Sequence, residues 1–508
     1  MTVIKKAFSM QSFITRNALL LTLPIVATLQ GAGIDSSQPL KSSPRPNIVL
    51  ILIDDMGYGD VKPFGCTNCQ TPALDRMANE GLKFTSFYAA PVCSASRAQI
   101  QTGCYAPRVS IPAVLPPASS VGLNPKEHTV AELLKAQGYA TMAIGKWHLG
   151  DQPEFFPLNY GFDHYFGLPY SNDMLRSEAS DGKRVVPLMR DNKVISLWSE
   201  DDQDQMTRLY TEEAVKFIKE NRDHPFYLYL AHNAVHFPIH PGPEFRGKSG
   251  HGRYYDWVEE IDWSAGQVMQ TLRQLHLETN TLVFFTSDNG PWLVHGADAG
   301  SAGPLRGGKG STWEGGLRES TIAWWPGRVP ASRVTDAVAG EIDLLPTFVK
   351  LAGGTVPTDE PIDGADISQI LLGQSDVSAR EAHYYYLGYQ LQAVRSGPWK
   401  LAFKPQDYSA NYQENAEHHG EHQPGLRLYN LVTDIGERTN VAAQFPEEVQ
   451  KLKALADHEE ATLCGGPHGP GVRPPGYVTT PQFLYPVTPT ELKRAEELNA
   501  RMYKGLKH

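Results

Sequence analysis

Short runs of consecutive apolar residues alternate with longer amphipathic stretches along the first three quarters of the chain. Four of these runs are bounded by polar residues, which is the pattern of strands buried on both faces of a sheet. They are residues 48–53, 139–144, 226–230 and 282–286. Because helical stretches separate them, we expect an α/β fold in which a large, mostly parallel sheet is sandwiched by helices.

Capping residues mark where several of the predicted helices begin. Thr71-Pro72 places a proline in the first turn of a helix. Thr129 and Glu132 have the spacing of a capping box, which predicts the start of another helix. A longer helical stretch covers residues 254–275, between the third and fourth predicted strands.

In the last quarter of the chain the pattern changes to alternating apolar and polar positions, at residues 392–403 and 426–431, followed by a helix near 447–461. Alternation with a period of two predicts antiparallel strands with one face in water. We therefore expect a large N-terminal domain over residues 46–373. A smaller C-terminal α+β domain, built on an antiparallel sheet, should cover residues 374–508.

The first residues have the pattern of an export signal: basic side chains, an apolar run over 18–29 and then small residues. We expect a signal peptide over residues 1–33 and a Ser- and Pro-rich linker over 34–45. The run is shorter than the ~18 residues that a membrane-spanning helix needs, and no later segment is long and apolar enough. The sequence predicts export to a periplasm, a lysosome or the medium, without stable membrane insertion after signal removal.

Composition and charge narrow the classes of function. With 508 residues and 41% apolar content, the chain can bury a large core and form an ordered enzyme. Its formal net charge of −10 argues against a general attraction to nucleic acid or to an anionic membrane. An anionic substrate would therefore need a local basic pocket.

The five cysteines are an odd number, so in an exported chain four can pair and one remains. They are Cys66, Cys69, Cys93, Cys104 and Cys464. The first two form a C-x-x-C without a second pair at zinc-site spacing, so we do not expect a zinc site. A surface disulfide or free thiols is the expected state of this pair.

Acidic residues follow two of the predicted strands. Asp54-Asp55 comes after the first strand and Asp288-Asn289 after the strand at 282–286. Either pair alone is common in turns. Because parallel strands present ligands at their carboxyl edge, the pairs together indicate a site of hard oxygen ligands suited to Ca²⁺ or Mg²⁺.

Basic residues follow the other two predicted strands. Lys146 and His148 lie in the segment Gly145–Gly150, and His232 and His236 follow the strand at 226–230. Another lysine, Lys309, lies in a glycine-rich loop that no strand immediately precedes, so this is not a nucleotide-binding P-loop. Lysine and histidine beside a divalent metal can neutralise an anion and transfer protons.

The segment Cys93-Ser94-Ala95-Ser96-Arg97, ahead of a helix-compatible stretch, resembles the sulfatase signature. In that signature Cys-x-Pro-x-Arg, or its alanine variant, directs oxidation of the cysteine to formylglycine (3-oxoalanine). The acidic pairs and the segments with Lys146 and His236 also occur in the order and approximate spacing of that family. Ala95 stands where proline is commonest, which bears on the efficiency of oxidation.

The resemblance covers nearly all of the chain after the signal. It is closest to the arylsulfatase A branch of the alkaline phosphatase superfamily, and includes residues 169–173 and, in the small domain, residues 428–431 with Gly436-Glu437. It implies an alkaline phosphatase-like fold and a sulfuric ester hydrolase acting on aryl or carbohydrate sulfate monoesters. The nucleophile would be a formylglycine hydrate, with a covalent sulfo-enzyme intermediate. The implied partners are a sulfated small molecule or glycan and a formylglycine-generating maturation enzyme.

The resemblance also implies roles for individual residues. The metal ligands would be Asp54, Asp55, Cys93, Asp288 and Asn289. The catalytic residues would be Cys93, Arg97, Lys146, His148, His236 and Lys309. The substrate-binding residues would be Lys146, Ser171, His236 and Lys309. Within these sets His236 is the candidate acid for the leaving alcohol and His148 takes the proton in the elimination step, whereas His232 has no matched role.

Three alternatives remain open from the sequence. A phosphonate or phosphate ester hydrolase of the same superfamily could use similar residues. A carbohydrate-binding relative without turnover would keep the fold, and an unmodified Cys93 could act as a thiol nucleophile. The alcohol itself is not identified, because we expect its recognition in variable loops at 178–204 and 408–423.

Overall fold

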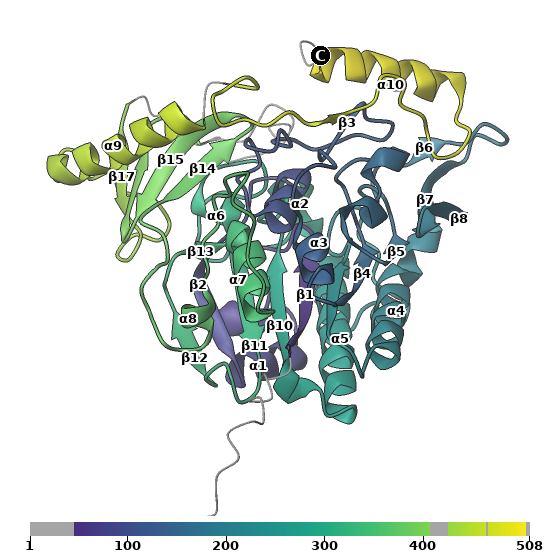
Figure 1. The fold of residues 1–508 in the computed structure, drawn as a ribbon, viewed down its shortest axis with the longest axis horizontal. Coiled ribbons are helices and arrows are strands. Elements are labelled where there is room, and N and C mark those ends of the chain that lie inside the picture. Colours follow the sequence, from purple (N-terminus) through teal and green to yellow (C-terminus); the bar gives the residue numbers. More distant parts are fainter. Residues whose placement is uncertain (1–44, 407–424, 464–465, 504–508) are drawn as a thin grey trace, which may run out of the picture. The chain divides into compact units, whose positions relative to one another are not determined.

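Twelve strands form one large mixed sheet in the part of the chain that the computed structural model describes, which is residues 45–406, 425–463 and 466–503 (Figure 1). The order is β12-β2-β11-β10-β1-β9-β4-β5-β7-β6, with β13 paired to β2 and β8 to β7. The expected signal peptide, the linker up to residue 44, the loop at 408–423 and Cys464 lie outside the described residues.

The centre of the large sheet is parallel, as the sequence predicts. Its strands are β10 (Thr281–Ser287), β1 (Asn47–Ile53), β9 (Phe226–Ala231), β4 (Ala140–Gly145) and β5 (His164–Gly167). The outer strands are β2 (Leu82–Tyr88), β6 (Arg176–Ser177), β7 (Arg184–Arg190), β8 (Lys193–Trp198), β11 (Arg318–Trp324), β12 (Arg333–Thr335) and β13 (Ala339–Gly340). The four predicted buried strands are thus β1, β4, β9 and β10.

Alternate side chains of β1 enter two different hydrophobic cores. Ile48 and Leu50 pack on one face of the sheet, and Val49 and Ile51 on the other. The first core is covered by α2 (Cys93–Thr102), α3 (Val130–Lys135) and α7 (Leu344–Leu351), and the second by α1 (Pro72–Asn79), α4 (Met206–Glu220) and α5 (Arg253–Gln274). The expected capping box is present at α3, where Thr129 Oγ1 accepts a hydrogen bond from the Glu132 amide at 3.3 Å.

A second, smaller sheet is antiparallel throughout and confirms the predicted fold class. Its strands are β14 (His383–Leu387), β15 (Gln390–Ser396), β16 (Trp399–Ala402) and β17 (Arg427–Asn430). The helix α9 (Pro446–Thr462) packs on β15 and β16. The remaining elements are α6 (Glu314–Leu317), α8 (Ser368–Leu371), α10 (Pro489–Met502) and the two-stranded pair β3 (Val121–Gly122) and β18 (Gly476–Tyr477).

Residues 178–204 are predicted from the sequence to be a variable loop, but they are not one. They contain the whole β7–β8 hairpin, at one end of the large sheet. All five central residues of β7, Val185 to Met189, are buried. Val186 and Leu188 pack in one hydrophobic core and Met189 in the other, so both faces of the strand are covered.

The C-x-x-C pair is present as free thiols, which is one of the two states expected from the sequence. Cys66 and Cys69 are both buried, in the core that contains Val61 and Leu74. Their Sγ atoms lie 2.9 Å apart. The turn that carries them packs against α1, which removes both thiols from solvent.

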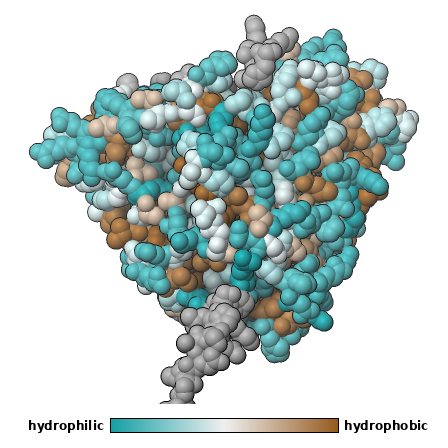
Figure 2. All heavy atoms as spheres, in the orientation of Figure 1, coloured by the Kyte–Doolittle hydropathy of each residue, from teal (hydrophilic) through white to brown (hydrophobic). Residues whose placement is uncertain are grey.

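No helix among the described residues is long and apolar enough to cross a membrane. On the face seen in Figure 2, hydrophobic side chains are interspersed with hydrophilic ones. Such scattered apolar side chains are ordinary on a protein surface.

Candidate active site

Four neighbouring parallel strands bring the polar residues singled out in the sequence to one edge of the large sheet. In the order β10, β1, β9 and β4, the strands are followed by Asp288-Asn289, Asp54-Asp55, His236 and Lys146. Ligand atoms of four residues lie within 4.8 Å of one another: Asp54, Asp55, Cys93 and His236. All four are buried, so a dense group of ionisable side chains lies at the carboxyl ends of the strands.

Helix α2 presents Cys93 and Arg97 to this group from the same side. The two residues are four apart, which places them on one face of a helix. Cys93 Sγ lies 3.4 Å from Asp54 Oδ1. Arg97 Nη2 lies 2.8 Å from Asp288 Oδ2, and Nη1 donates to the Lys146 carbonyl at 2.6 Å. The helix therefore fixes the cysteine and the arginine relative to the acidic residues.

Lys146 enters the site because Gly145 ends β4 in a backbone conformation that favours glycine, with φ of +100°. A Cβ at this position would lie 1.8 Å from the Ala231 carbonyl oxygen, so the close approach of β9 also requires glycine. Lys146 Nζ forms a buried ion pair with Asp54 and donates to Ser171 Oγ at 3.2 Å. The lysine thus joins the serine to the acidic group.

Lys309 reaches the site from the glycine-rich loop. Its Nζ lies 2.7 Å from Asp55 Oδ1. His236 approaches the same carboxylate from β9, with its Nε2 3.5 Å from Asp55 Oδ2 and 3.4 Å from Ser171 Oγ. An acidic residue, a lysine, a histidine and a hydroxyl therefore surround one small volume.

The three histidines differ in their surroundings. Burial, together with Lys309, holds the pKa of His236 well below its usual range, and burial with Lys146 does the same for His148. His148 Nε2 donates to the Leu115 carbonyl at 3.1 Å, and its buried Nδ1 has no hydrogen-bond partner in the described structure. His232 contacts Ser264 of α5 instead, through its Nε2 at 3.1 Å, which fits a structural residue.

The carboxyl groups respond differently to the same burial. Burial, opposed by Lys309 and reinforced by Asp54, raises the pKa of Asp55 to about 7. Burial also raises the pKa of Asp288. At Asp54, burial is outweighed by Lys146 and other cations, which hold the pKa below its usual range. Burial thus disfavours the ionised forms of Asp55 and Asp288, and a bound cation would stabilise these ionised carboxylates.

Asn289 supplies an observation that fits a bound divalent cation. Its Nδ2 donates to Asp55 Oδ1 at 2.7 Å and to the Gly290 carbonyl at 3.0 Å. Its Oδ1 is buried and accepts no hydrogen bond from the described residues. Carboxylate oxygens with one unsatisfied amide oxygen are a donor set for Ca²⁺ or Mg²⁺. The sequence analysis did not include His236 among the metal ligands, although the structure places it in the same group.

The sequence matches two known families along its length, and the residues of this site all lie in the first match. Residues 46–354 match the sulfatase family, and residues 378–469 match the C-terminal region of aryl-sulfatase. The chain belongs to the sulfatase family. This confirms the resemblance found in the sequence, and the protein is a sulfuric ester hydrolase.

Relatives cover most of this sulfatase. N-acetylgalactosamine-6-sulfatase of Sus scrofa is 38% identical, over 88% of this chain and 91% of its own. Arylsulfatase A of Homo sapiens is 38% identical, over 81% of this chain and 87% of its own. The crystal structure of a sulfatase from Pseudoalteromonas sp. superposes with a TM-score of 0.75 at 28% identity, covering 82% of this chain and 90% of that one.

The small sheet of this sulfatase supports the loop that carries Lys309, a role that the sequence analysis missed. Lys400 of β16 is fully buried, 2.7 Å from Glu437 and 3.1 Å from Glu314. Its Nζ also donates to the Thr312 carbonyl at 2.9 Å, three residues beyond Lys309. The segment Gly436-Glu437 belongs to the family resemblance, but a lysine in an alternating strand gives no signal of burial.

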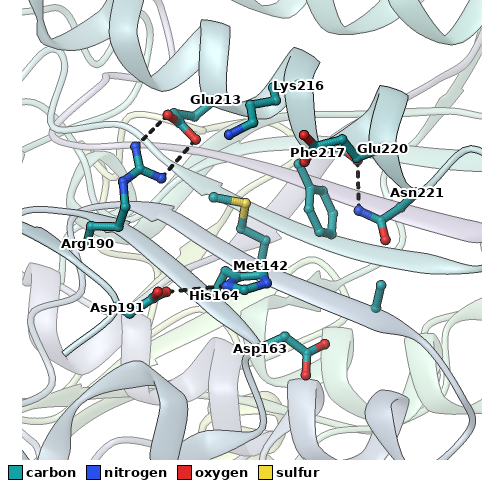
Figure 3. Close-up of a pocket in the computed structure, with 11 residues that line it drawn as sticks. Met142, Asp163, His164, Arg190, Asp191, Glu213, Lys216, Phe217, Glu220 and Asn221 are labelled. Atoms are coloured by element: carbon teal, nitrogen blue, oxygen red, sulfur yellow. Dashed lines mark hydrogen bonds and ion pairs between the residues drawn. The ribbon is translucent and has the colours of Figure 1, made fainter.

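A separate cavity of about 790 Å³ lies at the opposite end of β4 from the sulfatase site (Figure 3). Its charged side chains are largely paired with one another. Arg190 lies 2.6 Å from Glu213, and His164 lies 3.5 Å from Asp191. Because Ala140 lines this cavity and Lys146 follows the other end of the strand, the cavity is no part of the sulfate site.

Proposed function

We propose that this sulfatase hydrolyses sulfate monoesters of aryl or carbohydrate alcohols with a formylglycine formed from Cys93. The observation that carries the proposal is the position of Cys93 at the first turn of α2, 3.4 Å from Asp54 and on the same helix face as Arg97. The name of the N-acetylgalactosamine-6-sulfatase relatives supports a carbohydrate, and that of the arylsulfatase A relatives supports an aryl ester.

The surroundings of Cys93 make its thiol a poor nucleophile. Conversion of this cysteine to an aldehyde would explain its presence at the site. Burial, reinforced by Asp54, raises the pKa of the Cys93 thiol far above its usual value, so the reactive thiolate is disfavoured. The hydrated aldehyde supplies one hydroxyl that attacks sulfur and a second that allows sulfate to leave by elimination. The proposal requires a maturation enzyme that accepts Ala95 in the signature.

The charge of the site suits a sulfate monoester. Three carboxylates and three cationic side chains balance one another: Asp54, Asp55 and Asp288 against Arg97, Lys146 and Lys309. A divalent cation held by the oxygen ligands of Asp54, Asp55, Asp288 and Asn289 would add two positive charges and supply Lewis-acid chemistry. The resulting positive site attracts an anion, although the whole chain is acidic.

The side chains that contact the ester have separate roles in binding and proton transfer. Lys146, Lys309 and Ser171 orient the sulfuryl oxygens, and Arg97 fixes the carboxylates behind the nucleophile. His236 donates a proton to the departing alcohol from Nε2, which lies 3.5 Å from Asp55 Oδ2 and 3.4 Å from Ser171 Oγ. In the bound complex the negative charge of the ester opposes the lowering of the His236 pKa by burial and Lys309. His148 is buried beside Lys146 with Nδ1 unpaired, and accepts the proton when sulfate is eliminated.

The proposed reaction is tested with matched 4-nitrophenyl sulfate, phosphate and phenylphosphonate esters, measured as kcat/KM for each. We expect the sulfate to be the best substrate. Faster turnover of the phosphonate would favour the alternative hydrolase of the same superfamily. The predicted export is tested separately by the amino terminus of the mature protein, which should begin after the signal at residues 1–33.

A further inference from the structure

A cluster of aromatic side chains borders the sulfate site on the side of His236 and Lys309. The ring centroid of Trp292 lies 5.2 Å from that of His236 and 4.4 Å from Lys309 Nζ. The His295 ring lies 4.3 Å from that of Trp292 and stacks on Phe237, with 3.8 Å between centroids and 6° between the planes. We name Phe237, Trp292 and His295 the aromatic rim.

Exposure increases from the sulfate site toward the rim. His236 and Lys309 are 3% and 1% exposed, whereas each residue of the rim is half-buried. Leu293, beside Trp292 in the chain, is 36% exposed. Since the buried cations hold the sulfate end of a monoester, its alcohol has to point toward the more exposed side. The aromatic rim lies on the more exposed side of His236 and Lys309.

The rim is positioned by the same backbone segments as the sulfate site. Phe237 directly follows His236. Trp292 lies three residues after Asn289, and His295 follows in the short helix η6 (Leu293–Asp298). The rim and the residues at the strand ends therefore belong to the same backbone segments.

Two polar atoms beside the rim lack hydrogen-bond partners among the described residues. They are Nε2 of His295 and Oδ1 of Asp173, two residues after Ser171 in the chain. Asp173 is near enough for its charge to oppose the lowering of the His295 pKa by burial and Lys309. Both atoms are shielded from solvent, and burial of an unpaired polar group costs free energy. A ligand with hydroxyl groups would satisfy both, because a carboxylate accepts a hydroxyl proton and an imidazole nitrogen accepts or donates one.

We propose that the aromatic rim and Asp173 form a subsite for the neutral sugar ring of a sulfated carbohydrate. The rim packs against the apolar face of the ring, while Asp173 and His295 bind its hydroxyl groups. This inference rests on the proposed function and selects the carbohydrate over the aryl ester. An aryl alcohol would contact the rim but leave both polar atoms unsatisfied, and a sugar with a second anionic group would be repelled by Asp173.

The subsite is tested by comparing kcat/KM for monosulfates of galactose and glucose with kcat/KM for 4-nitrophenyl sulfate. We expect the Asp173→Asn variant to lower the ratio of sugar to aryl activity about tenfold, the effect of losing a charge-assisted hydrogen bond. His295→Phe keeps the stacking on Phe237 and removes the polar atoms, so it should lower the same ratio. A second sulfate on the sugar should reduce kcat/KM in the wild type.

Asp223→Asn is the matched control, because Asp223 is an exposed aspartate of the turn before β9, at the opposite end of the sheet. It should leave the ratio unchanged. If neither Asp173→Asn nor His295→Phe changes the ratio, or if the wild type cleaves the aryl sulfate but no hexose sulfate, the subsite is wrong while the proposed function stands. Failure of the wild type on every sulfate ester would instead contradict the proposed function.

Discussion

Lys309 Nζ lies 2.7 Å from Asp55 Oδ1, although 254 residues separate the two side chains in the sequence. The contact joins the glycine-rich loop to the end of β1, so the loop and the acidic residues form one site. Lys309 Nζ is also 4.4 Å from the centre of the Trp292 ring, so the lysine lies between the acidic residues and the aromatic rim.

Lys309→Ala should therefore lower kcat/KM by about 100- to 1000-fold, as expected for loss of one group that stabilises developing charge. Steady-state kinetics with an aryl sulfate provides the measurement. Lys83 is the control, because it lies on β2 and its amine donates a hydrogen bond to the Pro63 carbonyl. Lys83→Ala should keep near wild-type activity. An unchanged kcat/KM in Lys309→Ala would show that this lysine takes no part in the reaction.

The bound metal should be a hard divalent cation, and its binding should depend on the acidic residues. Asp288→Asn weakens the charge at the end of β10, so metal content and activity should fall together. Elemental analysis of the purified wild type should find stoichiometric calcium or magnesium. Stoichiometric zinc without either of them would contradict the assignment.

Lys400 provides a stability prediction with an internal control. Removing it leaves Glu314 and Glu437 buried without their shared cation, so Lys400→Met should reduce the free energy of unfolding by about 3–5 kcal/mol. Lys404 pairs with Glu460 at the surface, where the two side chains are 33% and 40% exposed. Lys404→Met should therefore cost at most about 1 kcal/mol. Equal effects of the two changes in urea unfolding would argue against the buried network.

The stability of the fold should depend on pH through Asp262. Its carboxylate accepts hydrogen bonds from the Ala73 and Leu74 amides at the start of α1, and burial raises its pKa from 3.8 to about 7. The folded protein keeps this proton when the unfolded chain has lost it, so the stabilisation is complete below about pH 4 and is lost as pH rises through about 7. Asp262→Asn cannot titrate, and its stability relative to the wild type should increase from pH 5 to pH 8. Thermal unfolding at both values, with Asp223→Asn as the control, measures the difference.

The sequence predicts the parts of the structure that follow from local patterns. β1 and β10 are continuous apolar runs, so their burial and the positions of Asp54 and Asp288 at their ends follow from the alternation of strands and helices. The capping box at Thr129 is equally local. Cys93 and Arg97 needed the family signature in addition, because neither residue type alone indicates a site.

Other features depend on contacts between distant segments. Burial of Lys400 arises from Glu314 and Glu437, which come from separate parts of the chain. The position of Trp292 beside His236 likewise depends on how β9 and β10 lie in the sheet, with β1 between them. The hairpin within residues 178–204 differs from the predicted loop, because the burial of β7 depends on β5 and β8, between which it lies in the sheet. No local pattern in the sequence reports such pairings.

The most direct test of the account is the chemical state of Cys93 in active enzyme. Trypsin should release residues 84–97, between Lys83 and Arg97, with Cys93 as the only cysteine. In protein made with a competent maturation enzyme, the mass of this peptide should show sulfur replaced by oxygen with loss of two hydrogens. The modified fraction should rise in proportion to specific activity across preparations, and Cys93→Ala should be inactive. Full activity in protein whose Cys93 is entirely an unmodified thiol would contradict the account.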